Sequence, residues 1–172
     1  TQLEVESNNV NDPDDAGGAV TALDRPSGIV TSADGAQLYV ASRFGNAVLV
    51  FNRTNAAGSG FGRLSYASVL RNGLGGVQGL GGAFDLALSP DNGQLYVVGE
   101  SSDAIAVFDR AADGVLTWRT QIRKNDPGVH GLGGPQAVEV SPDGTQVYVA
   151  GFADDSFTVF RRATAAGTGV AV

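Results

Sequence analysis

The sequence predicts an all-β fold built from a repeated unit of four short strands. Three observations support this prediction. The same residue spacing recurs three times along the chain, short runs rich in Val, Tyr, Phe and Ile alternate with turn sequences, and no window shows a sustained helical period. At 172 residues, the chain is also long enough to bury a hydrophobic core.

The repeat is anchored by Leu23, Leu80 and Leu132. Each of these leucines is followed, at the same distances, by a serine, a tyrosine, a phenylalanine and an arginine. In chain order these residues are Ser32, Tyr39, Phe51 and Arg53, then Ser89, Tyr96, Phe108 and Arg110, then Ser141, Tyr148, Phe160 and Arg162. Because the offsets agree in all three copies, we place the repeats at 23–79, 80–131 and 132–172, preceded by 1–22.

Each repeat is expected to form antiparallel strands joined by tight turns. First strands are predicted at 28–31, 84–88 and 137–140, second strands at the LYV or VYV runs, third strands at AVLVF, AIAVF and SFTVF, and fourth strands from Leu64 and Leu116. The turn sequences are Ser-Pro-Asp-Asn-Gly at 89–93 in the second copy, Ser-Pro-Asp-Gly at 141–144 in the third, and Asp34-Gly35 in the first. Proline sets φ and glycine accepts a positive φ, so these turns predict hairpins.

The two ends of the chain match additional fourth strands. Residues 1–6 align with GRLSYA, and 167–172 fall where another fourth strand begins. Four-stranded antiparallel units at intervals of about 50 residues are typical of β-propeller blades. We therefore predict an all-β protein of three four-stranded β-propeller blades plus an extra strand, with 1–22 supplying the outer strand and an acidic loop of a preceding blade.

Three blades are fewer than the roughly four to eight that close a propeller, so open apolar faces and unpaired strand edges are expected. Three explanations stay open. The chain is a fragment of a larger propeller, it completes a ring with a second chain, or it is a stable three-blade unit. The expected partners are therefore other blades of the same protein or a second protein chain.

Composition and charge exclude several classes of protein. The formal net charge is −7, Lys124 is the single lysine and the arginines are scattered along the chain. The chain therefore has no run of basic residues that would bind nucleic acid. No apolar run approaches the roughly 18–20 residues that span a membrane as a helix. The chain has no cysteine, which excludes disulfides, thiol catalysis and cysteine-bound zinc within it.

One motif connects the repeats to a known family. It is Ser141-Pro-Asp-Gly-Thr-Gln-Val-Tyr-Val-Ala-Gly151, followed by Asp155 and Val159-Phe-Arg-Arg162. This motif resembles the lactonase-like seven-bladed β-propellers and the related YVTN-type surface-layer repeats, and the resemblance covers about 23–172. It implies the fold, and it implies an extracytoplasmic location (periplasmic, cell surface or secreted). Because family members include sugar-lactone hydrolases and surface-layer components, it does not select an activity.

The acidic loop at 8–15 is the candidate metal site. Asp12, Asp14 and Asp15 offer closely spaced carboxylate oxygens, which are the ligands that calcium prefers. However, the loop lacks the DxDxDG pattern and Pro13 interrupts it, so a solvated turn-rich loop is the competing interpretation. Calcium is the one cofactor that the sequence suggests.

His130 is the candidate ligand contact. It lies in a segment that connects an outer strand to the next inner strand, so we expect it on the face where the central channel opens. A single imidazole there can act as an acid, a base or a ligand-binding group. The competing interpretation is an exposed loop histidine, because Gln78 occupies the matching position of the preceding repeat.

Other recurrent polar residues are interpreted as structural. Asn46, Asp103 and Asp155 share one turn position, which favours side-chain capping of backbone N–H groups. The three aligned arginines predict ion pairs or backbone contacts between blades. The Gly-Leu-Gly-Gly stretches lack the GK[ST] of a phosphate loop and are expected to allow close backbone packing.

The predicted function is a β-propeller scaffold for protein–protein or ligand binding within a larger protein or assembly. The alternative is part of a lactonase-like hydrolase, with its site on the channel face and catalytic residues in other blades. No GxSxG turn leads into a helix, and no catalytic set can be assembled from the sequence. An enzyme is therefore the less favoured hypothesis.

Overall fold

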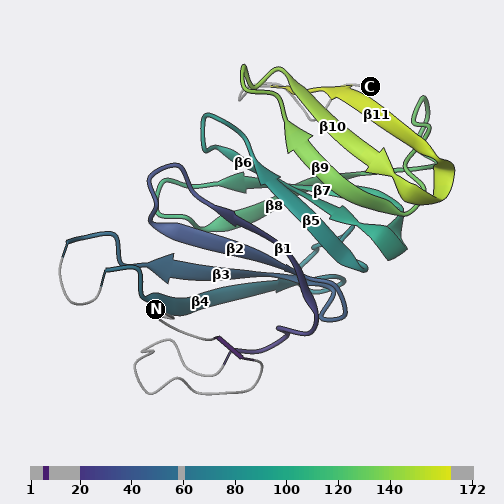
Figure 1. Cartoon of the computed structure of the whole chain (residues 1–172). Coiled ribbons are helices and arrows are strands. Elements are labelled where there is room, and N and C mark those ends of the chain that lie inside the picture. The colour runs from purple at the N-terminus through teal and green to yellow at the C-terminus, as the bar shows by residue number, and fades with distance from the viewer. Residues whose placement is uncertain (1–5, 8–19, 58–60, 164–172) are drawn as a thin grey trace.

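Three antiparallel β-sheets lie side by side in the structure, a computed structural model that describes residues 6–7, 20–57 and 61–163 (Figure 1). The predicted all-β propeller-like architecture is confirmed. The expected fourth strand at 167–172 lies outside the described residues, as does the strand expected at 1–6 except for Glu6.

Each sheet is one blade with its strands in sequence order. Blade 1 contains β1 (Pro26–Thr31), β2 (Gln37–Ser42), β3 (Ala47–Arg53) and β4 (Leu64–Arg71). Blade 2 contains β5 (Ala83–Leu88), β6 (Gln94–Gly99), β7 (Ala104–Arg110) and β8 (Leu116–Arg123). Blade 3 contains β9 (Pro135–Val140), β10 (Gln146–Gly151) and β11 (Ser156–Arg161). Short 3₁₀ turns follow β6 and β10, at η1 (Glu100–Ser102) and η2 (Phe152–Asp154).

The blades pack face to face through apolar side chains. Tyr39 of blade 1 shares a buried cluster with Leu86 of blade 2, and Tyr96 of blade 2 shares another with Val138 of blade 3. Both tyrosines are fully buried. Because strand residues point alternately to the two faces of a sheet, one blade can pack against both neighbours. Burying a large apolar side chain contributes about 1.5–3 kcal/mol, so these interfaces hold the blades together.

The first strands of the three blades form the inner side of the arrangement. β1 packs against β5, and β5 packs against β9, whereas the strand pairing of each lies within its own sheet (Figure 1). These inner strands place the loops that form the candidate functional site.

The first hairpin of every blade is held by the same serine and aspartate. Ser89 Oγ donates to Asp91 Oδ1 at 2.5 Å and accepts the N–H of Gln94 at 3.0 Å. The equivalent serine–aspartate bonds measure 2.5 Å in blade 1 and 2.6 Å in blade 3. The turn therefore forms in blade 1 even though Ala33 replaces the proline there.

In the part of the chain that the structure describes, no helix has the length and apolar character needed to cross a membrane.

Candidate functional site

The three inner strands begin at one end of the molecule, which we call the mouth. The antiparallel register places the start of each inner strand beside the end of the second strand, as in the pair Ala83 and Gly99. The loops that follow β2, β6 and β10 therefore meet at the mouth, together with the connections that enter β5 and β9.

Three polar side chains from three different blades join at the mouth, and we call them the mouth cluster: Arg43, Glu100 and Gln136. Glu100 Oε2 accepts hydrogen bonds from Arg43 Nε at 2.8 Å and from Nη2 at 2.5 Å. Its other oxygen, Oε1, accepts from Gln136 Nε2 at 2.8 Å. Hydrogen bonds between charged groups are short and strong, and two of them from one guanidinium to one oxygen fix the orientation of Arg43.

Aromatic rings lie beside the cations of the mouth. The guanidinium of Arg43 lies 5.1 Å from the centre of the Phe84 ring, and that of Arg25 lies 4.1 Å from the Phe44 ring. Cation–π contacts of this kind contribute about 0.5–1 kcal/mol at exposed sites. Arg43 stays partly exposed, so its guanidinium can also contact a carboxylate or hydroxyl of a bound ligand.

The mouth cluster was not predicted from the sequence, because its residues differ between the three repeats. Arg43 and Glu100 occupy one repeat position, where the third copy has Phe152. A repeat position that holds a cation in one copy and a carboxylate in the next, while the surrounding spacing stays the same, could have indicated a functional site. The contact with Gln136 requires the three-dimensional arrangement of the inner strands.

A polar hollow of about 280 Å³ lies between the two mouth loops of blade 2. Its lining residues are Ser102, Asp103, Arg123, Lys124, Asn125 and Asp126. Lys124 Nζ donates to Asp154 Oδ1 of blade 3 at 2.5 Å, and Gly133 N donates to Oδ2 at 2.8 Å. The hydrogen bond from Lys124 and the one from Gly133 lower the pKa of Asp154, so this carboxylate is charged and already paired.

His130 lies in the connection between β8 and β9, as the sequence predicts, and its side chain is exposed. Its backbone carbonyl accepts a hydrogen bond from Thr158 Oγ1 at 2.9 Å. Among the described residues, no hydrogen bond or ion pair joins the imidazole to the mouth cluster, to a serine or to a carboxylate. A ligand contact for His130 stays a prediction.

The candidate metal ligands Asp12, Asp14 and Asp15 lie outside the described residues. Within the described ranges, no group of three or more His, Cys, Asp or Glu side chains is placed to hold a metal ion. Calcium binding by the acidic loop stays a prediction.

The capping role expected for the recurrent turn residues is found at both junctions between blades. Asn46 Oδ1 accepts the N–H of Gly82 at 2.7 Å, and Asp103 Oδ1 accepts the N–H of Gly134 at 2.7 Å. Both residues are left-handed, with φ of 48° and 47°, and Asp155 of blade 3 has the same conformation with φ of 48°. Asn and Asp tolerate this conformation better than most residues.

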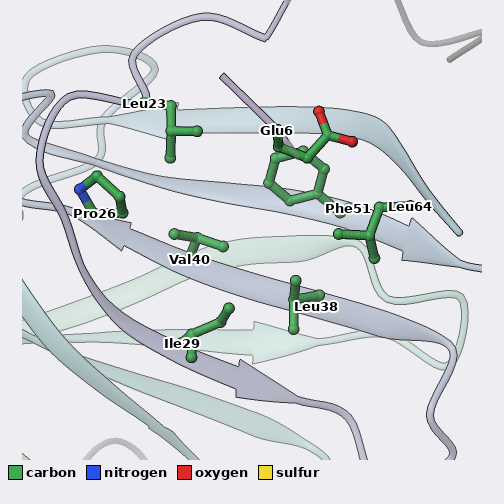
Figure 2. A pocket seen from close by; sticks show the side chains of 8 residues that line it. All are labelled: Glu6, Leu23, Pro26, Ile29, Leu38, Val40, Phe51 and Leu64. Carbon is green, nitrogen blue, oxygen red and sulfur yellow. The ribbon is translucent and has the colours of Figure 1, made fainter. Parts of the chain in front are cut away.

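An apolar pocket of about 210 Å³ lies on the face of blade 1 that is turned away from blade 2 (Figure 2). Its lining residues are Glu6, Leu23, Pro26, Ile29, Leu38, Val40, Phe51 and Leu64. Ile29 is 64% exposed, whereas its counterparts Leu86 and Val138 in the other two blades are 5% and 4% exposed. The pocket is therefore the surface on which a preceding blade would pack.

The family model described as "Lactonase, 7-bladed beta-propeller" matches residues 77–170. Among curated proteins, none matches the chain.

Solved structures similar to the chain include two proteins with lactonase names. The periplasmic gluconolactonase PpgL of Pseudomonas aeruginosa is 28% identical, with a TM-score of 0.66 over 84% of this chain and 37% of that one. A protein of Bacteroides fragilis, to which 6-phosphogluconolactonase activity is ascribed, is 23% identical, with a TM-score of 0.66 over 85% of this chain and 37% of that one.

A protein of Lactobacillus plantarum is 24% identical, with a TM-score of 0.64 over 86% of this chain and 40% of that one. The chain thus spans well under half the length of these similar proteins. Three sheets form part of a propeller, so other blades or chains complete it. The matched family model covers more than half of the residues, and the chain belongs to the lactonase family of seven-bladed β-propellers.

Proposed function

We propose that the chain supplies three blades of a propeller that binds a sugar acid or its lactone at the mouth. The observation that carries this proposal is the mouth cluster, in which Glu100 holds Arg43 and Gln136 from the two adjacent blades. A guanidinium fixed by a carboxylate and left partly open to solvent suits a ligand rich in carboxylate and hydroxyl oxygens. The gluconolactonase name of one similar structure supports the same class of ligand.

In lactone hydrolysis by such a propeller, these three blades would carry out only part of the reaction. Water adds to the lactone carbonyl, the ring C–O bond breaks, and negative charge develops on the carbonyl oxygen. The donors of Arg43 would stabilise that charge, and Glu100 would keep them in place. Glu100 itself accepts bonds from two side chains, so the base that activates water is assigned to the remaining blades.

A binding scaffold without catalysis is the second candidate function. It is favoured by the large apolar side chains that the outermost faces expose, Ile29 on blade 1 and Phe157 on blade 3. Exposed apolar patches of this kind mark surfaces that bind other protein elements. We place the protein outside the cytoplasm in both cases, supported by the periplasmic location named for the similar Pseudomonas protein.

The test uses glucono-δ-lactone as substrate and gluconate as ligand, with the protein in the form in which its propeller is complete. We expect hydrolysis above the uncatalysed rate, and about a tenfold or greater loss in kcat/KM when Arg43 is replaced in Arg43→Gln. The control is Arg161→Gln, which changes an exposed arginine of β11. Hydrolysis that is equal in both variants would remove Arg43 from the site. Absence of both hydrolysis and gluconate binding would favour the scaffold.

A further inference from the structure

Each inner strand contains a β-bulge at the same repeat position, just inside the mouth. The register of β5 with β6 shifts between Ala83 and Asp85, so Phe84 is the extra residue. The corresponding extra residues are Ser27 in β1 and Gln136 in β9. Bulges re-aim side chains, and they are common beside functional sites. The three bulges therefore set the direction of the side chains where the inner strands enter the channel.

Two of the extra residues contact the mouth cluster. The guanidinium of Arg43 lies over the ring of Phe84, 5.1 Å from its centre. Gln136 Nε2 donates to Glu100 Oε1 at 2.8 Å. The bulges thus connect the mouth cluster to the start of the channel wall.

The residue that follows each bulge is Gly28, Asp85 or Ala137, so blade 2 alone places a polar side chain there among the three blades. A strand rises about 3.3 Å per residue, and Asp85 therefore lies one step deeper in the channel than Phe84. Gly28 of blade 1 leaves the space that Asp85 occupies. A Cβ at Gly28 would lie 2.9 Å from the Cα of Asp85 and 3.0 Å from its Oδ1.

A hydrogen bond to blade 3 fixes the carboxylate of Asp85 at the channel wall. Its Oδ2 accepts the N–H of Val138 at 3.0 Å. Val138 belongs to β9, which among the described strands pairs with β10 on one side, so this N–H points away from the sheet at its inner edge. The inner edge of a blade faces the central channel of a propeller. The carboxylate therefore lies between β5 and β9, beside the channel.

The other oxygen of this carboxylate, Oδ1, is available to a ligand. Within the described ranges, no hydrogen bond or ion pair reaches it, and Asp85 is only partly buried. β5 packs against β1 on one side and β9 on the other, so both blade junctions beside Asp85 are complete. An ionised carboxylate only accepts hydrogen bonds, and a hydroxyl group is a neutral donor that suits it.

We propose that Asp85 binds a hydroxyl group of the ligand and so determines specificity for hydroxylated lactones and acids. This inference rests on the proposed binding of a sugar acid or its lactone at the mouth. Arg43 contacts the carboxylate or the lactone carbonyl, and Oδ1 of Asp85 accepts a hydrogen bond from a hydroxyl that lies deeper in the channel. A lactone without hydroxyl groups gains nothing from Asp85.

The test compares glucono-δ-lactone with δ-valerolactone, which has the same ring without hydroxyl groups, in the protein with its propeller complete. Asp85→Asn keeps an acceptor for the N–H of Val138 through the amide oxygen. The amide nitrogen then replaces Oδ1, which turns an acceptor into a donor. For glucono-δ-lactone, we expect about a tenfold loss in kcat/KM, mainly through a higher KM, and a similar rise in the Kd of gluconate. For δ-valerolactone, kcat/KM should change less than about twofold.

Asp109→Asn is the matched control in the same blade. Asp109 pairs with Gln94 at the end of β7 opposite the mouth, and it accepts a hydrogen bond from Arg119 at 2.9 Å. This variant should leave the hydrolysis of both lactones and the binding of gluconate unchanged.

Equal losses for the two lactones in Asp85→Asn would overturn the inference, because they would indicate a purely structural role. Unchanged kinetics with glucono-δ-lactone would overturn it as well. Arg43→Gln should slow both lactones, since both have the carbonyl group. Failure of the proposed function removes that effect of Arg43, whereas failure of this inference removes only the difference between the lactones. A wild-type protein that neither hydrolyses glucono-δ-lactone nor binds gluconate would overturn both.

Discussion

Arg162 reaches across a blade interface and places Nη2 within 2.8 and 2.7 Å of the two carboxylate oxygens of Asp91. The guanidinium side chain is 3% exposed, while the carboxylate is about half exposed. The pair therefore links the interior of one blade to the rim of another. Because Arg162 also donates to Gln94, its removal takes hydrogen bonds away from two acceptor side chains of the interface at once.

Arg162→Met should lower the free energy of unfolding by about 1.5–3 kcal/mol, the range for hydrogen bonds to a charged group. Denaturant unfolding followed by far-ultraviolet circular dichroism measures this change. The matched control is Arg161→Met, which replaces the adjacent, exposed arginine and should change the free energy by less than about 0.5 kcal/mol. Equal losses in the two variants would contradict a role for the interblade contact.

Acid should weaken the same junction in a defined pH range. The pKa of Asp91 falls from 3.8 to about 2 in the folded protein, so folding favours the charged carboxylate. A lowered folded-state pKa gives stability that is present above pH of about 4 and is lost as the pH falls toward about 2. Asp91→Asn should flatten the pH dependence of unfolding in that range. An unchanged acid profile in the variant would show that Asp91 is not responsible.

Gly99 should not tolerate a methyl group. A Cβ at this position would lie 2.2 Å from the carbonyl oxygen of Gly79, which belongs to the loop that enters β5. Both atoms are fixed by backbone, so Gly99→Ala should cost about 1–3 kcal/mol of stability. Gly93→Ala is the control, because the nearest atom to its added Cβ is a side-chain oxygen at 3.4 Å. Thermal unfolding of both variants distinguishes close packing from a general cost of replacing glycine.

Asp103→Ala should destabilise the protein more than Asp155→Ala, by about 1 kcal/mol, the typical worth of a cap. Both residues are left-handed, so both changes carry the same backbone strain. Asp103 also caps Gly134 of the next blade, so the difference between the variants isolates that hydrogen bond. Asp103→Asn should be tolerated because Asn46 makes the equivalent contact in blade 1. The comparison is made by chemical denaturation, and equal losses would show that the cap contributes nothing.

The repeat spacing was sufficient to predict the strands, the hairpins and the structural role of the aligned arginines. Tyr39 and Phe51 recur because the same interface is built at each junction, and such positions appear directly in an alignment of the copies. The mouth cluster could not be found in this way. Glu100 contacts Arg43 and Gln136 only because the inner strands converge, and no local pattern encodes that approach.

The exposure of Gln146 also could not be predicted from the sequence, since Gln37, Gln94 and Gln146 all occupy the repeat position two residues before the aligned tyrosine. Which of them is buried depends on whether another blade lies against it. The sequence shows that the residue belongs to an interface, and the structure shows whether that interface is occupied.

Each junction in this chain uses an arginine from the later blade and a carboxylate from the earlier one, at constant repeat positions. A blade duplicated in the gene would therefore arrive with both a donor and an acceptor, and a deleted blade would leave a matching pair behind. Blade number can then change through gene duplication without the invention of a new contact. The residues at the mouth follow no such rule, since one repeat position holds Arg43, Glu100 and Phe152 in the three copies.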